Sequence, residues 1–488
     1  MPVHSARPRT LRSFPLVPWL ISTLALVLLA VAAWIRLKFG AVTFEQIITN
    51  LPIFNGEGIG DQSVLGSALL LCLALPVAVT TVPAVIVWMT SRDRQRPRRR
   101  RRIVIPSVAL AVALGTLLAV AGVPQAASAM LDPRTIGDFY VTPSVDAVPA
   151  KPRNLITVYL ESTENTFSDE TLFGENLLAN LDAATSGWAS YDLHQFPTGG
   201  WTMAGIVGTE CGIPLKSKLL TVGVNPNDFG EQVEHYLPGA TCLGDVLAGH
   251  GYTNAFVGGA HTRFGGKDTL LSDHGYSSIQ GLADWEAAGE QRSDISAWGL
   301  SDARMFQHAQ DTLAGLRAAG TPFNLTILTL DTHDPGAVYP SCTGTDEARL
   351  ATALKCSGRA VAGFLDYLKR NGYLDDTVVI LMGDHVKNTG DSDQLRAQLE
   401  SVPERTIYFR AWSPDGIRFT RQGADQLSML PTTLELLGMK VPAGRAALGV
   451  SFVGDHDLAG TALALPADEY RSLLEAPSSE IYQRFWQS

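Results

Sequence analysis

Three long stretches of the chain consist almost entirely of apolar residues, and all of them lie in its first quarter. Each is about 20 residues long, which is the length that an α-helix needs to cross the hydrocarbon core of a bilayer. None of them contains an Asp or a Glu. The stretches are residues 14–34, 64–89 and 103–123. The pattern therefore predicts a transmembrane region of three helices within residues 1–123, rather than helices buried in a soluble core.

The charges between these stretches predict their direction through the membrane. Residues 91–102 contain eight Arg, and Arg7, Arg9 and Arg12 precede the first stretch. The loop between the first two stretches carries three acidic residues and has basic residues only at its edge. Short loops rich in Lys and Arg stay cytoplasmic, so the N-terminus is predicted inside and residues 124–488 outside. In this position the Arg run also suits contact with anionic membrane lipid.

The overall charge hides two regions of opposite sign. Residues 1–123 contain 13 Lys and Arg against four Asp and Glu, a net charge of +9. The whole chain carries −10, so the remaining residues carry −19. Such an acidic body argues against nucleic acid as a partner, because nucleic-acid binding relies on cations at the phosphates.

Beyond the apolar region, short β-rich runs alternate with helical stretches. The runs are LITVYL, NAFVGGA, LTILTL, VVILM and TIYFRAW, and the clearest helices are predicted over 302–319 and 347–370. Alternating strands and helices with continuous apolar strands predict an α/β, doubly wound, mostly parallel sheet. We expect a catalytic domain over 151–455 and a peripheral tail over 456–488, with a helix near 467–486.

Residues 124–150 are rich in Ala, Pro, Ser and Val without sustained periodicity, and they predict a linker. Within it, Ala127-Ser128-Ala129 fits either a signal-peptidase site that would release the domain or a piece of flexible linker.

Four of the five cysteines lie outside the predicted membrane region, and Cys72 lies within it. An even number of cysteines on the outer side favours disulfides. Four cysteines allow three connectivities, and pairing by proximity gives Cys211–Cys242 and Cys342–Cys356. A zinc site is less favoured, because no pair has C-x-x-C spacing.

Polar residues follow four of the predicted strands. They are Glu161; His261 and Arg263; Asp331, Thr332, His333 and Asp334; and Asp384 and His385. Ligands of open α/β sheets bind beyond the carboxyl ends of the strands, so these side chains are expected at one edge. Two carboxylates and an imidazole suit Mn²⁺ or Zn²⁺. Singly, Glu161 could instead cap a helix, and Asp384-His385 could form a turn.

A candidate nucleophile lies in the segment FPTGGWTMAGIVGTECGIPL. Gly199-Gly200 permits a sharp turn, and the apolar residues that follow predict a helix with Thr202 at its start. The backbone N–H groups of a helix N-terminus stabilise negative charge, so a hydroxyl there can become a nucleophile. The alternative is that Thr202 only caps the helix.

These motifs resemble those of the lipoteichoic acid synthase and phosphoglycerol transferase I family, in the alkaline phosphatase/sulfatase superfamily. The similarity is strongest to the branch that modifies periplasmic glucans. Six motifs occur in the family's order across residues 154–385: NLITVYLEST, GGWTMAGIVGTECGIPL, RFGGKDTLLSDHGY, WGLSD, LTLDTHDP and LMGDH.

The resemblance implies a divalent metal, most often Mn²⁺ with Mg²⁺ or Zn²⁺ as alternatives, and a set of site residues. The implied metal ligands are Glu161, Thr202, Asp384 and His385, and Thr202 is also the implied nucleophile. The implied substrate-binding residues are His333 for phosphoglycerol, Trp298 and Asp302 near the headgroup, and Arg263 and Lys267 for the phosphate.

The resemblance further implies a multi-pass enzyme of the bacterial inner membrane with a periplasmic catalytic domain. It would move glycerol phosphate from phosphatidylglycerol to a periplasmic glucan. The chain ends soon after the predicted catalytic domain, where the transferase of enteric bacteria continues, which leaves the acceptor open.

Three rival functions remain at this point. A phosphoethanolamine transferase usually has Gly-Glu after the metal-binding Asp-His, whereas Val386 and Lys387 follow here. A sulfatase-type hydrolase needs a C-x-P-x-R core, which CGIPL at Cys211 lacks; a phosphodiesterase on the same fold is the related alternative. A non-catalytic lipid or glycan sensor should have lost at least one of the four implied metal ligands, and none is missing.

Overall fold

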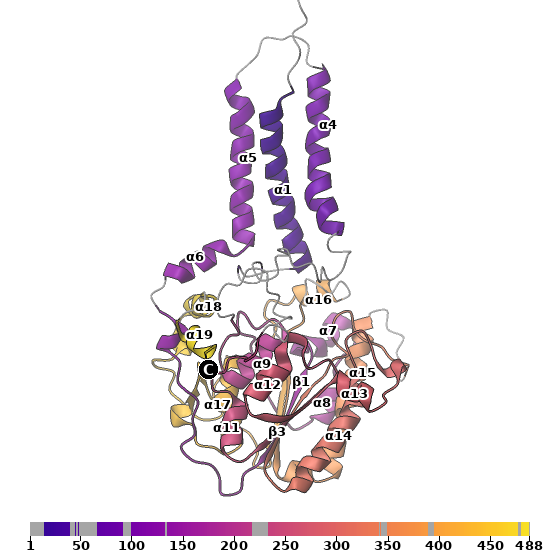
Figure 1. Cartoon of the computed structure of the whole chain (residues 1–488), viewed down its shortest axis with the longest axis vertical. Coiled ribbons are helices and arrows are strands. Elements are labelled where there is room, and N and C mark those ends of the chain that lie inside the picture. Colours follow the sequence, from indigo (N-terminus) through magenta and orange to yellow (C-terminus); the bar gives the residue numbers. More distant parts are fainter. Residues whose placement is uncertain are drawn as a thin grey trace, which may run out of the picture. The chain divides into compact units, whose positions relative to one another are not determined.

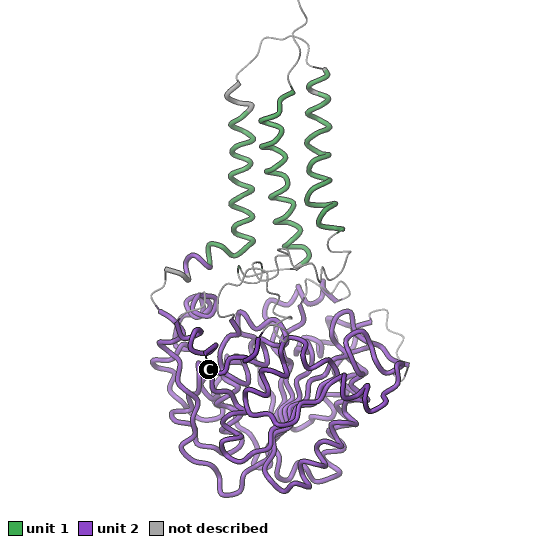
Figure 2. The backbone as a smooth tube through the Cα atoms, in the orientation of Figure 1, with its two compact units in different colours: residues 1–47, 51–125 green, residues 48–50, 126–488 purple. Residues whose placement is uncertain are grey.

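The computed structural model describes residues 14–39, 66–90, 99–131, 134–216, 233–340, 349–388, 395–476 and 480–487, together with Phe44, Ile47 and Cys342. The chain divides into two compact units (Figure 2). Unit 1 comprises residues 1–47 and 51–125, and unit 2 comprises residues 48–50 and 126–488. The acidic loop and most of the Arg-rich loop, on which the predicted orientation depends, lie outside the described residues.

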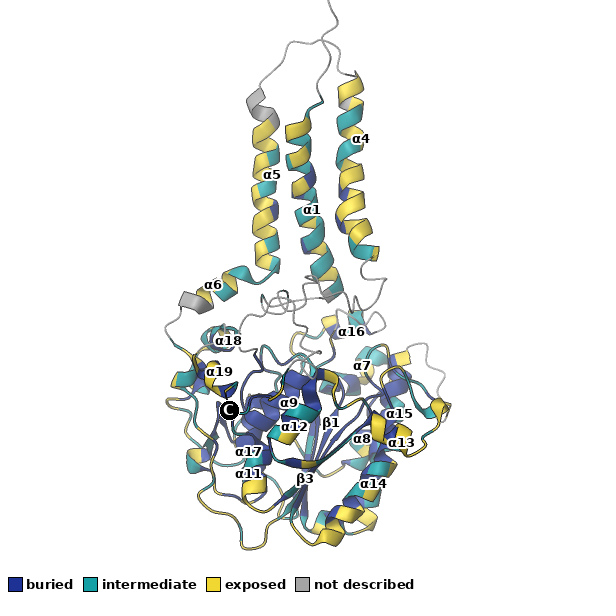
Figure 3. Ribbon diagram, viewed as in Figure 1, coloured by how far each residue is buried: buried dark blue, intermediate teal, exposed yellow. Residues whose placement is uncertain are grey.

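Unit 1 contains three long apolar helices, as predicted. They are α1 (Leu16–Phe39), the π-helical turn η1 (Leu69–Ala74) continued by α4 (Leu75–Thr90), and α5 (Arg99–Val120). Three helical stretches, Leu16–Lys38, Gly66–Ile86 and Ile103–Val120, are long and apolar enough to cross a membrane. Hydroxyl groups join two of the helices, because Thr23 Oγ1 lies 2.7 Å from Thr80 Oγ1. Most of the remaining helix surface consists of exposed apolar side chains (Figure 3), which suits a lipid environment.

The segment predicted as a linker is more ordered than expected. The helix α6 (Val123–Leu131) spans Ala127-Ser128-Ala129, and a 3₁₀ turn follows at Ile136–Asp138. Single β-bridges then join Val141 to Ala447 and Ala147 to Lys440. These backbone hydrogen bonds fix the end of the segment to unit 2, although its composition shows no periodic pattern.

Unit 2 is built on a seven-stranded sheet in the order β2-β7-β6-β1-β5-β3-β4. Five strands are parallel: β1 (Asn154–Leu160), β3 (Thr253–Gly258), β4 (Tyr276–Gln280), β5 (Phe323–Leu328) and β6 (Thr377–Gly383). Two further strands are added antiparallel at one side: β7 (Phe409–Trp412) pairs with β6, and the edge strand β2 (Ala189–Ser190) pairs with β7. All five apolar runs identified in the sequence contribute a strand, which confirms the mostly parallel α/β sheet.

Alternate residues of β1 pack on opposite faces of this sheet. Leu155 and Tyr159 belong to one hydrophobic core, and Ile156 and Val158 belong to the other. The first core is covered by α9 (Thr202–Cys211), α11 (Leu243–Gly249), α12 (Lys267–Asp273) and α17 (Met429–Leu436). The second is covered by α8 (Ala179–Ala184), α13 (Leu282–Ala287), α14 (Asp302–Ala319) and α15 (Arg349–Arg370). Helices therefore cover both faces (Figure 1), which confirms the doubly wound architecture.

Shorter elements complete the unit. They are α7 (Glu170–Phe173), α16 (Arg396–Glu400), the hairpin β8 (Arg445–Ala446) and β9 (Gly449–Val450), and 3₁₀ turns at Asn165–Ser168, Phe264–Gly266, Arg292–Asp294, Tyr373–Asp375, Gln426–Ser428, Pro442–Gly444 and Ala462–Ala464.

The C-terminal segment differs from the predicted peripheral tail with one helix. It forms two helices, α18 (Ala467–Glu475) and α19 (Glu480–Phe485). Their apolar side chains, among them Leu474 and Tyr482, are buried in the first core. Apolar residues recur there at helical spacing over one or two turns only, which is too short a pattern to predict such burial.

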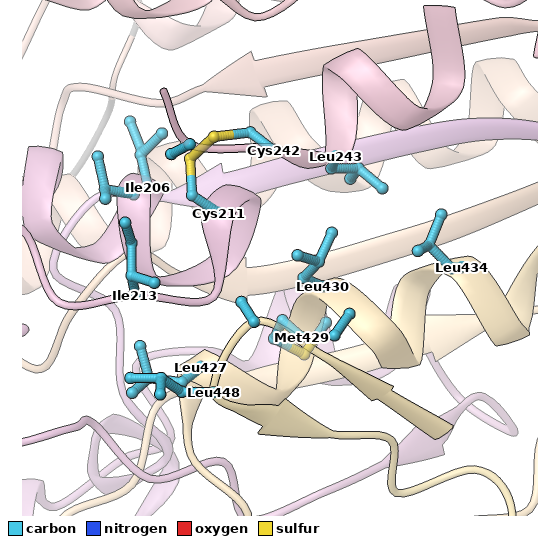
Figure 4. Close-up of a cluster of buried hydrophobic side chains, with 14 of the residues drawn as sticks. Ile206, Cys211, Ile213, Cys242, Leu243, Leu427, Met429, Leu430, Leu434 and Leu448 are labelled. Carbon is cyan, nitrogen blue, oxygen red and sulfur yellow. A yellow bond between two sulfur atoms is a disulfide. The ribbon is translucent and has the colours of Figure 1, made fainter. Parts of the chain in front are cut away.

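Both predicted disulfides are present. Cys211, the last residue of α9, is bonded to Cys242, which immediately precedes α11 (Figure 4). Cys342 is bonded to Cys356 on α15. His274 lies close to the first pair, but the two sulfurs are bonded to each other, so they offer no thiolate to a metal.

Candidate active site

Glu161, Asp384 and His385 come together at the carboxyl ends of two neighbouring strands. Leu160 at the end of β1 is paired with Gly383 at the end of β6, so the residues that follow each strand are neighbours. One ligand atom from each side chain lies within 4.8 Å of the others. The three residues are 3%, 0% and 6% exposed. Strand register alone thus places two carboxylates and an imidazole in one buried cluster, which we call the acidic cluster.

The donor atoms of the acidic cluster fit a divalent metal cation. Asp384 Oδ1 accepts hydrogen bonds from the backbone N–H groups of Ser162 (2.7 Å) and His385 (2.9 Å), whereas buried Asp384 Oδ2 has no hydrogen-bond partner. His385 Nδ1 lies 2.8 Å from the Val386 carbonyl oxygen, so its N–H can donate there. That bond leaves His385 Nε2 free to face Asp384 Oδ2 at 3.6 Å. An imidazole oriented in this way, beside an unpartnered carboxylate oxygen, is typical of a metal ligand.

The electrostatics of the acidic cluster point in the same direction. Burial raises the pKa of Asp384 to about 7, and the neighbouring Glu161 carboxylate adds to the rise. Burial also pushes the pKa of Glu161 upward, but His385 and His333 together with other groups outweigh it, and the net shift is downward. Two carboxylates held this close are unfavourable when both are ionised, and a bound cation would offset that repulsion.

Thr202 is the first residue of α9 and lies beside the acidic cluster. The residue that precedes the helix is Trp201, and no side chain caps the helix there. Thr202 is therefore not the N-cap residue, and its hydroxyl instead donates to Glu161 Oε2 at 3.3 Å. The structure thus brings together all four residues that the resemblance implied as ligands.

Two small features of the sequence let α9 approach the strand end so closely. A Cβ on Gly205 would lie 2.0 Å from the Asp384 carbonyl oxygen, so only glycine fits there. The side-chain amide of Gln426 donates to the same carbonyl oxygen at 2.6 Å. Neither Gly205 nor Gln426 was singled out from the sequence, although GGWTMAG spaces its glycines as a close helix–strand contact requires.

His333 follows β5, and its ring contacts the ring of Trp298 in a tilted arrangement. Their ring centroids are 3.9 Å apart, with an angle of 41° between the planes. The preceding residue, Thr332, donates its hydroxyl to the backbone carbonyl of Glu161. One short loop therefore connects the acidic cluster to the two predicted substrate-binding rings.

Asp302 has a different environment from the one expected of a headgroup ligand. It is fully buried, and its carboxylate accepts from the Leu330 N–H at 2.7 Å and from the Ser357 hydroxyl at 2.6 Å. Burial raises its pKa to about 6, and these hydrogen bonds oppose the rise. This geometry favours a residue that positions the loop carrying His333 rather than one that touches a substrate. Trp298 and Asp302 belong to one motif, WGLSD, and the motif does not indicate which of its side chains is buried.

The two predicted phosphate-binding cations also differ. Lys267 is buried, its ammonium donates to the Phe264 carbonyl oxygen at 2.7 Å, and burial lowers its pKa to about 8. The charges of Glu161 and Asp384 partly oppose that shift, so Lys267 lies within electrostatic reach of the cluster. Arg263 is exposed, and no hydrogen bond or ion pair joins it to the cluster among the described residues.

A further buried cation near the site was noted from the sequence only as a departure from a pattern. Lys387 is 3% exposed, and its ammonium lies 3.4 Å from Asp334 Oδ1. Its charge helps to lower the pKa of Glu161. Its backbone N–H donates to Glu164 at 2.9 Å, and Arg405 pairs with the same carboxylate. The feature of the sequence that could have indicated this buried cation is a lysine two residues after the Asp-His pair.

One family model and several curated proteins match this chain. The family model described as Sulfatase matches residues 192–439, just over half of the chain. Phosphoglycerol transferase I of Xanthomonas axonopodis pv. citri (strain 306) is 33% identical over 313 residues, which cover 60% of this chain and 43% of the relative. Phosphoglycerol transferase I of Salmonella choleraesuis (strain SC-B67) is 28% identical over 357 residues, covering 68% and 45%. The chain thus spans less than half the length of these relatives.

Solved structures show distant similarity. The lipoteichoic acid synthase LtaP from Listeria monocytogenes has a TM-score of 0.48 at 18% identity, covering 64% of this chain and 78% of that one. The C-terminal periplasmic domain of EcEptC from Escherichia coli, in complex with Zn, has a TM-score of 0.45 at 13% identity, covering 65% and 90%. The match of the family model over just over half of the chain decides the classification, and the chain belongs to the sulfatase family.

Proposed function

We propose that this protein is a membrane-anchored transferase that moves glycerol phosphate from phosphatidylglycerol to a hydroxyl group of a periplasmic glucan. The observation that carries the proposal is the position of Thr202, whose hydroxyl lies 3.3 Å from Glu161 Oε2 at the start of α9. The curated relatives named phosphoglycerol transferase I support the same reaction class.

In the first half of the reaction, the Thr202 oxygen attacks the phosphorus of the lipid. Its hydroxyl proton has an acceptor in Glu161, to which it already donates. The bond from phosphorus to the diacylglycerol oxygen breaks, and that oxygen takes a proton from His333. The N–H groups in the first turn of α9 face the negative charge that develops at the phosphate.

In the second half, a glucan hydroxyl attacks the phosphoglyceryl-threonine. His333, now neutral, accepts the proton of that hydroxyl, and the Thr202 oxygen leaves and is protonated again. We prefer His333 over His385 for this role, because the Nε2 atom of His385 faces the acidic cluster.

Glu161, Asp384, His385 and Thr202 would hold the divalent metal. When bound, the cation supplies Lewis acidity and charge neutralisation at the phosphate. Two carboxylates, a hydroxyl and one imidazole form an oxygen-rich donor set, which favours Mn²⁺ over Zn²⁺, with Mg²⁺ as a further candidate.

The cations around the cluster favour a donor lipid whose headgroup has an anionic phosphate and a neutral glycerol. Lys267 and Lys387 are both buried near Glu161. A cationic ethanolamine headgroup would gain more from unpaired carboxylates than from these two ammonium groups. The net charge of −19 beyond residue 123 suits a neutral glucan better than a polyanionic acceptor.

The reaction also requires the site to face the periplasm. The predicted orientation places the N-terminus in the cytoplasm and residues 124–488 outside the inner membrane. After Arg102, only a fused reporter that works in the cytoplasm should be active. After Ala150, only a fused reporter that works in the periplasm should be active. The reverse pattern would rule out a periplasmic acceptor.

A headgroup assay tests the reaction itself. The full chain in vesicles is given labelled phosphatidylglycerol or labelled phosphatidylethanolamine together with a neutral glucan. We expect diacylglycerol and labelled glucan in equal amounts from phosphatidylglycerol only. Release of diacylglycerol from phosphatidylethanolamine alone would establish the rival transferase. Free glycerol phosphate without labelled glucan would establish a hydrolase.

A further inference from the structure

Two aromatic side chains of unit 2 remain exposed although they are large and apolar. Phe264 is 41% exposed and Trp298 is 38% exposed. Among the described residues of unit 2, only Val148, at 45%, is a third large hydrophobic residue with comparable exposure. The two aromatic rings contact each other edge to face, with centroids 6.0 Å apart, although they are 34 positions apart in the chain. Isolated exposed apolar residues are common, but a paired aromatic surface next to a site indicates a binding surface.

This aromatic pair borders the candidate active site on two sides. The Trp298 ring contacts the ring of His333. The Phe264 carbonyl oxygen accepts from Lys267. The next residue, Gly265, has φ +69°, and a Cβ there would lie 2.8 Å from the side chain of Met203, in the first turn of α9. Figure 1 shows α9 and α12 next to each other at this place. The pair is therefore held against the helix that carries Thr202.

An exposed cation is the direct sequence neighbour of Phe264. Arg263 precedes Phe264 and is exposed, and in the described part of the chain its side chain has neither a hydrogen bond nor an ion pair. Exposed aromatic rings combined with an unpaired guanidinium are the side chains that proteins place at a bilayer interface, where the rings enter the headgroup layer and the cation meets anionic lipid. We call Arg263, Phe264 and Trp298 the aromatic rim.

We propose that the aromatic rim is the surface through which unit 2 contacts an anionic lipid bilayer while it withdraws its lipid substrate. The inference rests on the proposed function, because it assumes a lipid donor. The bilayer is the occupant that fits, since the same chain carries three helices long and apolar enough to cross a membrane. The Lys267 ammonium lies 5.2 Å from the centroid of the Phe264 ring, so one side of the ring meets the site and its exposed part is available to the bilayer.

The first test compares two donors with the full chain in nanodiscs. One donor is long-chain phosphatidylglycerol diluted in phosphatidylcholine, and the other is a phosphatidylglycerol with butanoyl chains dissolved in water. Phe264→Ala should raise the mole fraction of the long-chain donor that gives half-maximal diacylglycerol release at least fivefold. It should change turnover of the soluble donor less than twofold. Val148→Ala, a matched exposed residue outside the rim, should change neither.

An equal loss on both donors would overturn the proposal, because Phe264 would then act only on the headgroup. An unchanged Phe264→Ala enzyme would overturn it as well. If the unmodified protein releases diacylglycerol from neither donor, the proposed function fails instead.

A second test needs no turnover and so separates these two failures. A bimane label is attached at Phe264→Cys or, as the control, at Val148→Cys, with Cys72→Ala in both. Lipid carrying a spin label near its headgroup should quench the label at position 264 at least threefold more than the label at 148. Adding Arg263→Gln should remove the increase of quenching with phosphatidylglycerol content. Equal quenching at both positions would overturn the bilayer contact.

Discussion

The acidic cluster and the aromatic rim lie side by side, but they are held in place by different means. The cluster follows β1 and β6, whose pairing extends to their last residues, and its three side chains are buried. The rim comes from a 3₁₀ turn and an irregular loop, and its side chains are exposed. The comparison teaches that the register of the sheet fixes the three proposed metal ligands. The side chains of the rim are supplied by loops.

The largest expected effect tests the chemistry proposed for Thr202, which lies beside the acidic cluster. Thr202→Ala should reduce diacylglycerol release per folded molecule by about three to four orders of magnitude, because the covalent step has no substitute. Thr202→Ser should retain part of the activity. Rates are measured on protein whose thermal unfolding matches the unmodified chain. Near-normal turnover of a folded, metal-loaded Thr202→Ala protein would eliminate the covalent mechanism.

The next effect tests whether the cluster acts through a metal. Glu161→Ala and Asp384→Ala should bind divalent metal more than about 100-fold more weakly, because loss of a residue that only supports a ligand already costs about 10- to 100-fold; equilibrium dialysis with Mn²⁺ measures this. Excess Mn²⁺ should restore part of their activity, whereas it should not rescue Thr202→Ala. Unaltered metal affinity in both variants would separate these carboxylates from metal binding.

His333 lies between the two regions, and its loss should have an intermediate effect. His333→Ala should lower kcat for diacylglycerol release about 10²- to 10⁴-fold, the usual contribution of a general acid. A donor with a better leaving group, such as a nitrophenyl ester of glycerol phosphate, should lose much less, because its departure needs no proton. Equal losses on both donors would argue that His333 only binds the headgroup.

The smallest effect sharpens the role of the loop that joins the two regions. Asp302→Ala leaves buried backbone N–H groups of that loop without an acceptor, which costs about 1–3 kcal/mol of folding free energy. Asp302→Asn keeps an acceptor and should recover most of that stability and of the activity. Denaturant titration and kinetics of both variants check this. If Asp302→Asn is as inactive as Asp302→Ala but fully stable, Asp302 contacts the substrate after all.

The sequence allowed the sheet to be predicted because buried parallel strands are continuous apolar runs. The two strands that were not identified lack such runs: β4 reads YSSIQ, and β2 has two residues. Helix α14 was predicted over its full length because its apolar residues recur over several turns. The short C-terminal helices offered no comparable length of pattern.

The candidate site was predictable where strand ends and spacing determine position. Glu161, Asp384 and His385 follow their strands directly, so their proximity follows from register. The direction of a loop side chain does not follow from spacing. Asp302 is buried although a substrate contact was expected. Arg263 makes no hydrogen bond or ion pair with the cluster in the described part of the chain, and Lys387 is a buried cation that spacing did not predict.

The bond between Cys211 and Cys242 gives α9 a covalent attachment at the end opposite to Thr202. Disulfides persist in oxidising compartments and are rare where thiols are kept reduced. Under the proposed orientation, the helix that begins at Thr202 acquires this restraint only after unit 2 has left the cytoplasm. Under the proposed orientation, bond formation and export of the chain are therefore a single event, and a molecule that is not exported lacks the bond at the end of α9.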